Sequence, residues 1–599
     1  MHLLAHPRKK RGKKYTYYSI AESYREDGKN KKRILLRLGR LSSLQVQQIR
    51  NVLKVTQSPD IFVATIEDIL LEDHWAYLDV AVLNHLWDNW DLSKPFPASK
   101  NKNISTANIA KILTFNRCID PGSKLYAVEW FKETTCDHLL GIVNKRDCVN
   151  DSRIYRELKL IEESKDDIEQ HLYKTLKERN KDSFRIVFYD LTDSYFEGRK
   201  CKLARPGRTK YYGFRSRKIV LSLLVNSEGY PFSWDILEGD TIDVNTLKER
   251  SDYCEKRFGI SDITWVFDRG MVSDENLNYL NEKGWKYITA LDKNQIPNVP
   301  GVDLSWFEDL DIENVKKRLI DMGFRRYDEC LYYRDLGDSE RKHYIIGFNP
   351  ELFVDERKNR EQRIEKGVKY LERENIKLSN AKRNRDGRVT DRRINETLKR
   401  LGARKYLDYH LEPIQLKVKR KKPVKSFRIV YRKKDEVIKR AEKLDGLCMI
   451  VTNHLQEEHK GKGEKKIFDA ERVISSYRDK YRVEEAFKMV KSFIKFQPVY
   501  VYKDEHVRAH YTICSLAYLL DMTITNMLRK SRIDEVSSVE KAYKILGKCR
   551  IGEIKVKNSR HGGKKITTPT NLQKKLLDAL GCRHLISGEY MKSIGIGKM

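Results

Sequence analysis

The sequence predicts a multidomain α/β protein, and three observations carry that prediction. The chain has 599 residues, more than a single hydrophobic core accommodates. Between residues 184 and 291, strand-like and helix-like segments follow one another in the order β-β-β-α-β-α-β. Strand-rich, helical and strongly basic segments flank this stretch, so the rest of the chain is expected to form further modules.

The part of the chain before this stretch is predicted to hold a small β module and then a helical region. Two strand-like runs, 15–24 and 33–38, flank Asp27 and Gly28, a dipeptide that favours a tight hairpin turn. Residues 1–60 are therefore predicted to form a basic β-hairpin module. Residues 61–180 carry apolar side chains at helical spacing, which predicts a helical region.

Residues 181–292 are predicted to form the first part of a catalytic core. The pattern changes at Phe184 from helical spacing to short apolar runs bounded by turn residues, which is typical of strands. The order of strands and helices matches an RNase H-like core. The expected strands are 184–190, 218–225, 230–237, 263–268 and 285–291, and the expected helices are 244–258 and 273–283.

A basic, partly β insertion is expected over residues 293–468, where such a core would continue directly into its last acidic helix. The segment 357–393 has a helical and highly charged pattern, and the strand-like run 426–432 follows the basic run 417–425. Residues 469–535 are then predicted to supply the C-terminal helices of the core, and residues 536–599 a basic tail.

Three acidic residues are candidates for the catalytic site. Asp190 and Asp268 each end an apolar, strand-like run, whereas Glu484 lies within a predicted helix over 477–491. On that helix one side carries Glu484 together with aromatic and basic residues, while Glu485 is rotated about 100° away. The side chains expected on that side are Tyr477, Lys480, Tyr481, Glu484, Lys488 and Lys491.

Three carboxylates of this kind suggest a divalent-metal site. Hard oxygen ligands suit Mg²⁺ or Mn²⁺ better than zinc. A pair of such ions stabilises both the attacking and the leaving oxygen when a phosphodiester is displaced. Metal-dependent DNA cleavage by Asp190, Asp268 and Glu484, with two ions per site, is therefore the first hypothesis.

Composition favours a polyanionic partner. The formal net charge is +33 and the isoelectric point about 9.5, and neutralising phosphates releases condensed counterions. The ten cysteines form no Cys-x-x-Cys pair, so reduced thiols are expected rather than a zinc ribbon. The most apolar stretch, 511–520, is too short to span a bilayer. We expect a cytoplasmic, nucleoid-associated protein with no membrane partner.

The chain resembles the DDE transposases of bacterial insertion sequences, in the group with a Tyr-Arg-Glu-Lys signature around the catalytic glutamate. Tyr477, Glu484 and Lys491 match that signature, and Lys480 stands where the family usually has arginine. Residues 188–192 and 268–271 resemble the first two acidic motifs, and the resemblance covers about residues 15–520.

The resemblance implies cut-and-paste DNA transposition. Family members bind the inverted-repeat ends of a mobile element as a synaptic dimer, hydrolyse one strand with metal-activated water, and transfer the freed 3′-hydroxyl to DNA. The insertion covers the site and contacts DNA, and residues 61–180 become a candidate DNA-binding region. The expected DNA contacts of the site are Tyr477, Lys480, Lys488, Lys491 and Arg269.

Several alternatives remain open from the residues alone. A salt bridge to a neighbouring acid explains Arg269 as well as a phosphate contact does. The whole chain is also compatible with a structure-selective nuclease on the same core, or with an inactive or domesticated DNA-binding derivative. The basic residues of 417–425 and those around Arg392 are expected to lie where a DNA end enters the site.

Overall fold

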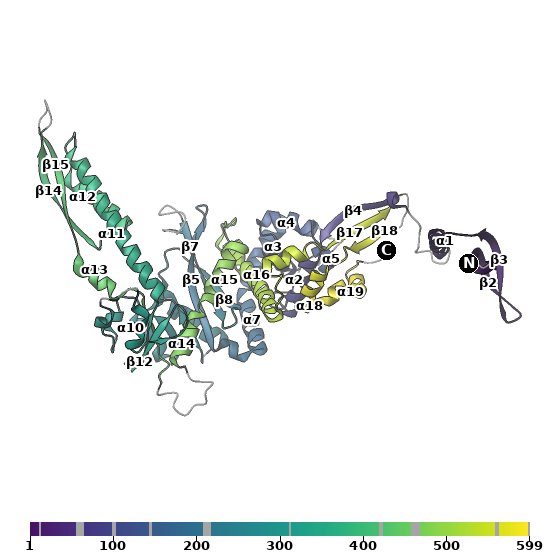
Figure 1. Ribbon diagram of the computed structural model, residues 1–599, viewed down its shortest axis with the longest axis horizontal. Helices are drawn as coiled ribbons and strands as arrows, with labels where there is room; N and C mark the ends of the chain where they lie inside the picture. The colour runs from purple at the N-terminus through teal and green to yellow at the C-terminus, as the bar shows by residue number, and fades with distance from the viewer. Residues whose placement is uncertain are drawn as a thin grey trace. The chain divides into compact units, whose positions relative to one another are not determined.

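The computed structural model confirms a mixed α/β, multidomain organisation (Figure 1). It describes residues 1–599 except 11–12, 56–64, 99–103, 143–146, 208–216, 261, 309, 311–312, 418–422, 457–467, 558–561 and 597–599. The chain divides into two compact units. One comprises Met1–Ile161 and Leu520–Met599, and the other comprises Glu162–Leu519.

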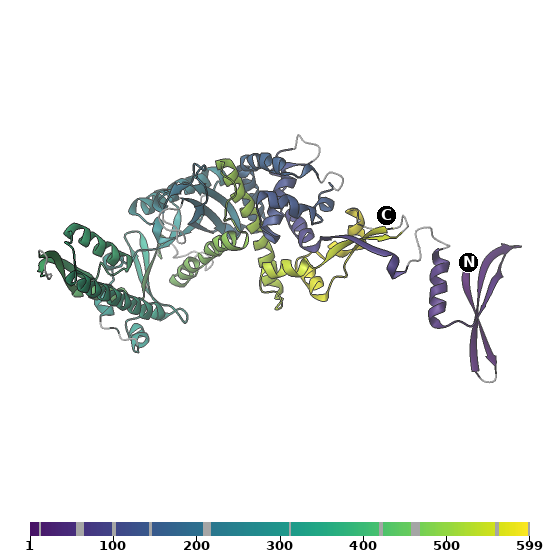
Figure 2. The same ribbon diagram turned by 90° about the horizontal axis from the view of Figure 1, so that it is seen from above.

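The N-terminal module is a three-stranded antiparallel sheet with helix α1 (Ser43–Val55) beside it (Figure 2). The predicted hairpin joins β2 (Lys13–Glu26) to β3 (Lys29–Gly39), and Asp27 and Gly28 both have positive φ, at 51° and 73°, as a tight turn requires. Strand β1 (His2–Lys10) adds a third strand to the predicted hairpin.

The rest of the first unit contains the expected helices and a second small sheet. The helices are α2 (Leu78–Asn89), α3 (Thr106–Ile119), α4 (Lys124–Lys132), α5 (Cys136–Leu139) and α6 (Asp151–Glu163). Trp87 is fully buried at their centre and packs edge-on against Phe115. The sheet pairs β4 (Ile69–Ala76) with β17 (Arg550–Val556), so the predicted helical region begins with a strand whose partner lies near the C-terminus.

The prediction of a basic tail over residues 536–599 is wrong. This segment folds into α17 (Val539–Leu546), β17, β18 (Gly562–Ile566), α18 (Asn571–Ala579) and α19 (Gly588–Ser593). Leu576, Leu577 and Leu585 are completely buried, and the hydroxyl of Tyr77 donates a 2.6 Å hydrogen bond to the carbonyl of Leu585. The many lysines of the segment occupy its surface, and they obscured the sparse apolar positions that form its core.

The second unit is built on a ten-stranded sheet with the order β11-β12-β13-β16-β10-β9-β5-β7-β6, in which β8 also pairs with β7. The two outermost strands are short, β11 (Arg325–Arg326) and β6 (Arg205–Pro206). The predicted strands and helices occur in the predicted order. They are β5 (Ile186–Phe196), β7 (Arg217–Asn226), β8 (Pro231–Leu237), α8 (Thr246–Phe258), β9 (Thr264–Phe267), α9 (Asp274–Glu282) and β10 (Lys286–Ala290). Strands β5, β9 and β10 run parallel to one another, and β7 and β8 form the antiparallel hairpin beside β5.

The predicted insertion is only partly separate from this sheet. Strands β12 (Tyr332–Ser339) and β13 (Lys342–Phe348) extend it, and β16 (Leu447–Thr452) joins β13 to β10 as the strand that returns the chain to the core. The extension was not foreseen, because hairpins pair with a distant sheet edge through backbone groups that leave little trace in local sequence.

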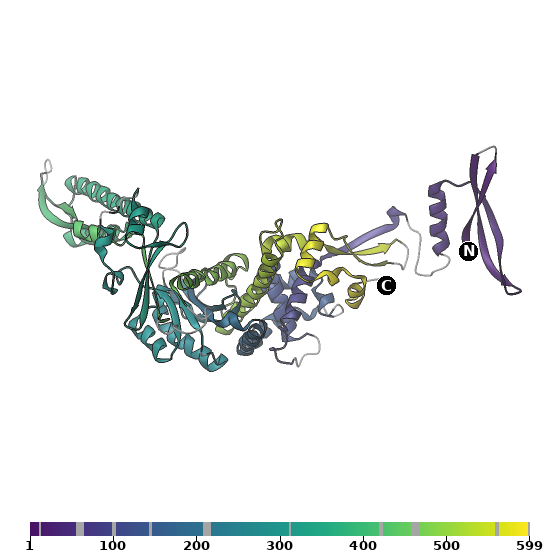
Figure 3. The ribbon, with the colours of Figure 1, turned by 60° about the horizontal axis from the view of Figure 1, so that its bottom comes forward.

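Between β13 and β16 the chain forms an arm, which stands out from the sheet in Figure 3. The arm contains α11 (Pro350–Ser379), α12 (Gly387–Arg400), β14 (Leu407–Leu416), β15 (Val424–Lys433) and α13 (Asp435–Glu442). Its own small core includes Leu371, Ile394, Leu398 and Ile429, so the arm is a folded element rather than a solvated charged loop. The basic run 417–425 lies partly outside the described residues.

Helix α16 (Asp504–Ser531) contains the apolar stretch 511–520, every residue of which is buried. No helix in the described ranges is both long enough and apolar enough to cross a membrane. All ten cysteines are free thiols.

Candidate active site

The register of β5 against β9 brings Asp190 and Asp268 to the same level of the sheet. The parallel pairing runs from Ile186 opposite Thr264 to Tyr189 opposite Phe267. Asp190 follows Tyr189 and Asp268 follows Phe267, so each acid is the first residue beyond the last pair. Because adjacent strands lie about 4.8 Å apart, this register makes the two residues neighbours.

Asp190 does not end its strand, although its apolar run suggested that it does. β5 continues to Phe196 because its other edge remains paired with β7, from Val187 opposite Asn226 to Phe196 opposite Arg217. Only β9 ends at the level of Asp190. Strand β5 is therefore hydrogen-bonded to β7 both before and after Asp190, and this pairing limits the movement of the Asp190 backbone.

Glu484 lies on α15 (Tyr481–Lys488), which packs over β5 and β7. The prediction of one continuous helix over 477–491 is wrong, because α14 (Ala470–Arg478) ends before α15 begins. At the junction the amide of Lys480 donates to the carbonyl of Tyr477 at 3.2 Å, and that of Val483 to Lys480 at 3.1 Å. These bonds span three residues instead of four, so the chain is tightened there.

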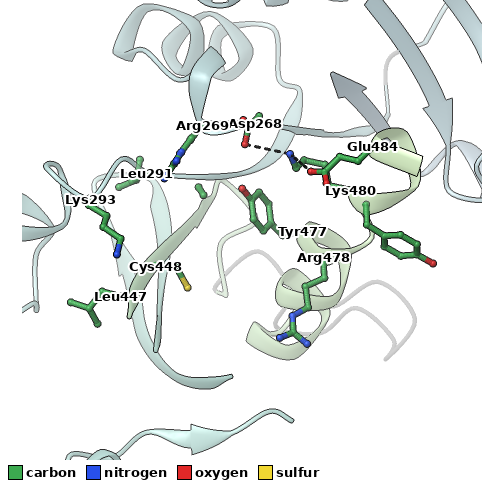
Figure 4. Close-up of a pocket in the computed structure, with 12 residues that line it drawn as sticks. Asp268, Arg269, Leu291, Lys293, Leu447, Cys448, Tyr477, Arg478, Lys480 and Glu484 are labelled. Atoms are coloured by element: carbon green, nitrogen blue, oxygen red, sulfur yellow. Dashed lines mark ion pairs between the residues drawn. The ribbon is translucent and has the colours of Figure 1, made fainter. Parts of the chain in front are cut away.

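The tightened turn directs Lys480 into the protein and Tyr481 toward solvent. The ammonium of Lys480 lies 3.3 Å from Oδ1 of Asp268 and 2.9 Å from Oε1 of Glu484, and it links the two carboxylates (Figure 4). The lysine side chain is 11% exposed, whereas those of Asp268 and Glu484 are 44% and 58% exposed. Two acids from distant parts of the chain thus meet at one buried cation.

Asp190 belongs to the same electrostatic group. Burial, helped by the negative charges of Asp268 and Glu484, raises the pKa of its carboxyl to about 6, although the positive charge of Lys480 opposes the shift. Burial lowers the pKa of Lys480, but Asp190, Asp268 and Glu484 outweigh that effect, so the pKa lies above its ordinary value. The three sequence-predicted acids therefore act on one another and on a single lysine.

The chemistry of these side chains fits a hard divalent cation. All three are carboxylates, and the Lys480 ammonium already holds a positive charge between two of them. Within the described ranges no three acidic, histidine or cysteine side chains are close enough together to hold a metal ion as they stand. A cation bound by all three acids would thus require their side chains to draw together and Lys480 to give up its contacts.

Two of the expected DNA-contact residues are exposed, and the other three are partly or largely buried or bound within the protein. Lys488 is exposed, and so is Arg269, whose guanidinium is 3.8 Å from Oδ1 of Asp292, which agrees with the salt-bridge alternative. Tyr477 is half-buried, and burial raises the pKa of its hydroxyl to about 12. Its side chain lines the cavity beside Lys480.

Lys491 is bound within the protein. A π-helical turn, Met489–Phe493, follows α15 and brings the Lys491 ammonium to 2.5 Å from the hydroxyl of Thr192 and 2.6 Å from the carbonyl of Asp193. Both partners lie on β5, directly after Asp190. The side chain therefore ties the end of the acidic helix to the strand of the first acid.

A cavity of about 480 Å³ opens beside Asp268 and Glu484. Leu291, Leu447, Cys448 and Tyr477 form part of its wall (Figure 4). Tyr481 lines it as well. Sequence reasoning missed two cations of this wall, Lys293 and Arg478, which pair with Glu356 and Asp328. Lys293 lies just beyond β10, and Arg478 ends the helix that precedes Glu484; these positions were the signal that could have identified them.

Comparisons with known proteins point to one family. Residues 183–520 match the family model described as the transposase DDE domain, and residues 5–59 match that of the IS1634 family transposase, N-terminal domain. None of the curated protein sequences matches the chain.

Solved structures with some similarity are also transposases. The piggyBac transposase synaptic complex with hairpin DNA is 9% identical, with a TM-score of 0.30, over 78% of this chain and 77% of that one. The Mos1 transposase paired-end complex with the left transposon end is 14% identical, with a TM-score of 0.14, over 32% and 60%. The Mos1 strand transfer complex is 14% identical, with a TM-score of 0.14, over 32% and 59%.

Proposed function

The chain belongs to the DDE transposases of insertion sequences, and on that premise we propose that it binds the ends of a mobile element and cleaves and joins DNA strands at Asp190, Asp268 and Glu484. The observation that carries the assignment of the three acids is their convergence. The β5–β9 register aligns Asp190 with Asp268, and Lys480 links Asp268 to Glu484.

The sheet supports an RNase H-like core in the second unit. Its five central strands lie in the order β8-β7-β5-β9-β10, with the hairpin strands on one side of β5 and the parallel strands on the other. Helix α14 packs against β10 and β16, and α15 against β5 and β7, so the third acid reaches the sheet from a helix that crosses it. The arm and the sheet extension are inserted between these elements.

The residues of the site have distinct roles in the proposed reaction. Bound Mg²⁺ or Mn²⁺ would supply the positive charge that stabilises the attacking and leaving oxygens of the phosphodiester. Asp190, Asp268 and Glu484 would hold two such ions. Arg269 and Lys488 are exposed near the acids and would bind non-bridging phosphate oxygens, which orients the scissile bond. Lys491 ties the end of the acidic helix to β5, and Tyr477 lines the cavity beside the acids.

The partners in this proposal are double-stranded DNA at the terminal inverted repeats and at the target, and a second copy of the chain in the synaptic complex. The net charge of +33 supports a polyanionic partner. Residues 1–60 and 61–180 are proposed to bind the ends, and the arm within 293–468 to contact DNA beside the site. The basic residues around Arg392 are exposed on α12 of that arm.

The test is a cleavage assay on duplexes that carry the DNA flanking the coding gene, with Mg²⁺ added or withheld. Asp190→Asn and Glu484→Gln should lower the cleavage rate by on the order of a thousandfold or more, because each removes a charge that holds a metal. End binding in a mobility-shift assay should be retained. Glu485→Gln is the matched control, since Glu485 is the exposed neighbour on the same helix. Loss of cleavage with Glu485→Gln but not with Glu484→Gln would refute the assignment.

A further inference from the structure

The ammonium of the largely buried Lys480 lies between the carboxylates of Asp268 and Glu484. Its ammonium contacts one oxygen of each carboxylate, at 3.3 Å and 2.9 Å, while the acids themselves face solvent. The lysine originates at the turn between α14 and α15, so the same turn that breaks the helix delivers the ammonium to the acids. The result is an internal cation at the oxygens that a divalent ion would use.

Two cations at these oxygens would exclude one another. An ammonium and a divalent ion a few ångströms apart repel each other strongly in a partly buried site, and each needs the same lone pairs. A lysine has a flexible four-carbon stem and a single point charge, so it can leave one set of oxygens without disturbing the backbone. The cavity beside it, lined by Tyr477 and Tyr481, offers a place for the displaced ammonium.

We propose that Lys480 is a positioning residue that competes with the divalent metal for Asp268 and Glu484, and that metal loading moves its ammonium into the adjoining cavity. There it would face a phosphate of the bound DNA end, so that DNA favours the conformation that admits the metal. The inference rests on the proposed function, because it requires these acids to be metal ligands. It adds a residue that controls when the ligands become accessible.

The first experiment measures Mn²⁺ affinity of the full chain without DNA, by electron paramagnetic resonance of free Mn²⁺. Lys480→Met should bind Mn²⁺ at least about tenfold more tightly than the unsubstituted protein, because an opposing charge is removed at contact distance. Lys503→Met is the matched control, since it removes an exposed lysine that has no proposed role in the site. Its affinity should stay within about twofold, because charges at an exposed position are screened by solvent and salt.

The second experiment follows Lys480 in the unsubstituted chain, so it does not depend on the folding of a variant. Acetylation by an N-hydroxysuccinimide ester, quantified by mass spectrometry, should modify Lys480 slowly without metal, because its side chain is 11% exposed and ion-paired. Added Mg²⁺ should increase that modification several-fold and leave Lys488 unchanged. Asp190→Asn should abolish the effect of Mg²⁺ on Lys480.

The outcomes separate this inference from the assignment of the site. Equal Mn²⁺ affinity with and without Lys480, with binding still lost in Asp190→Asn, would refute the competition and leave the metal site intact. Unchanged labelling of Lys480 while Mn²⁺ binds would likewise refute its displacement. If Mn²⁺ bound neither protein, or bound both regardless of Asp190, the metal site and the competition would be refuted together.

Discussion

At the scale of single residues, two lysines that share the helix face of Glu484 in the sequence are bound within the protein. Lys480 contacts two of the acids, and Lys491 contacts Thr192 and Asp193 on β5. Lys488, between them, is exposed. The three lysines share one side of an ideal helix but have different environments in the structure. The reason is that the backbone departs from α geometry both before and after α15.

Lys491→Met tests whether this lysine binds DNA or holds the site together. Its ammonium donates to a hydroxyl and a carbonyl of β5, and hydrogen bonds from charged groups contribute about 1.5–3 kcal/mol. We expect a lower thermal midpoint and slower cleavage, with the salt dependence of DNA binding unchanged. A phosphate contact would instead flatten the plot of log affinity against log salt by about one unit. Lys488→Met is the comparison: as the loss of an exposed, proposed phosphate contact, it should flatten that plot and leave the thermal midpoint nearly unchanged.

At the scale of elements, the arm shows how a two-stranded ribbon is stabilised away from the main sheet. Strand β15 pairs with β14 on one edge, and its other edge is met by α11. There the side-chain amide of Asn375 donates to the carbonyl of Ile429 at 2.8 Å and accepts from its amide at 2.7 Å. One asparagine thus satisfies both backbone groups of a residue in the small apolar core.

Asn375→Ala should loosen the arm locally. The substitution leaves the amide and carbonyl of Ile429 without their side-chain partner, which costs about 1–3 kcal/mol at a buried site. Hydrogen exchange should report this as faster exchange of the Ile429 amide and its neighbours on β15, with β5 and β9 unaffected. Asn380→Ala, at an exposed position after the same helix, is the control. Equal protection of β15 in both variants would show that the apolar contacts alone hold the ribbon.

At the scale of the whole molecule, positive charge accumulates on a folded arm. Helix α12 buries Thr390, Ile394 and Leu398 against the rest of the arm and exposes most of its basic residues. The arm begins after β13 and ends before β16, and β16 is the neighbour of β10 in the sheet that carries two of the acids. Such a surface is suited to phosphate contacts that position DNA without reading its sequence.

Neutralising the exposed basic residues of α12 should therefore weaken binding to any duplex. The substitutions are Arg388→Gln, Arg392→Gln, Lys399→Gln and Arg400→Gln. Each lost phosphate contact lowers the steepness of the plot of log affinity against log salt concentration by about 0.9. The slope measured by fluorescence anisotropy at several salt concentrations should therefore decrease by about 2–4. The thermal midpoint should change little, because the apolar face of α12 is retained. An unchanged affinity would locate the DNA contacts in residues 1–60 and 61–180 instead.

The sequence by itself determined the order of strands and helices in the core, the turn at Asp27 and Gly28, and the three acids that converge. These features depend on local backbone preference and on apolar periodicity, which neighbouring residues establish. The helices and strands of the arm lie within 293–468, the segment where the sequence predicts a basic, partly β insertion. The candidate site residues were therefore named from the sequence, whereas their contacts were not.

Only the tertiary structure decided how these parts meet. The pairing of Tyr189 with Phe267 makes two acids neighbours, the pairing of β4 with β17 folds the C-terminal segment, and the joining of β13 to β16 extends the sheet. The inward turn of Lys480 belongs with them, because it depends on two carboxylates that come from distant segments. Such contacts depend on burial and hydrogen bonding between residues far apart in the chain, and no local pattern encodes them.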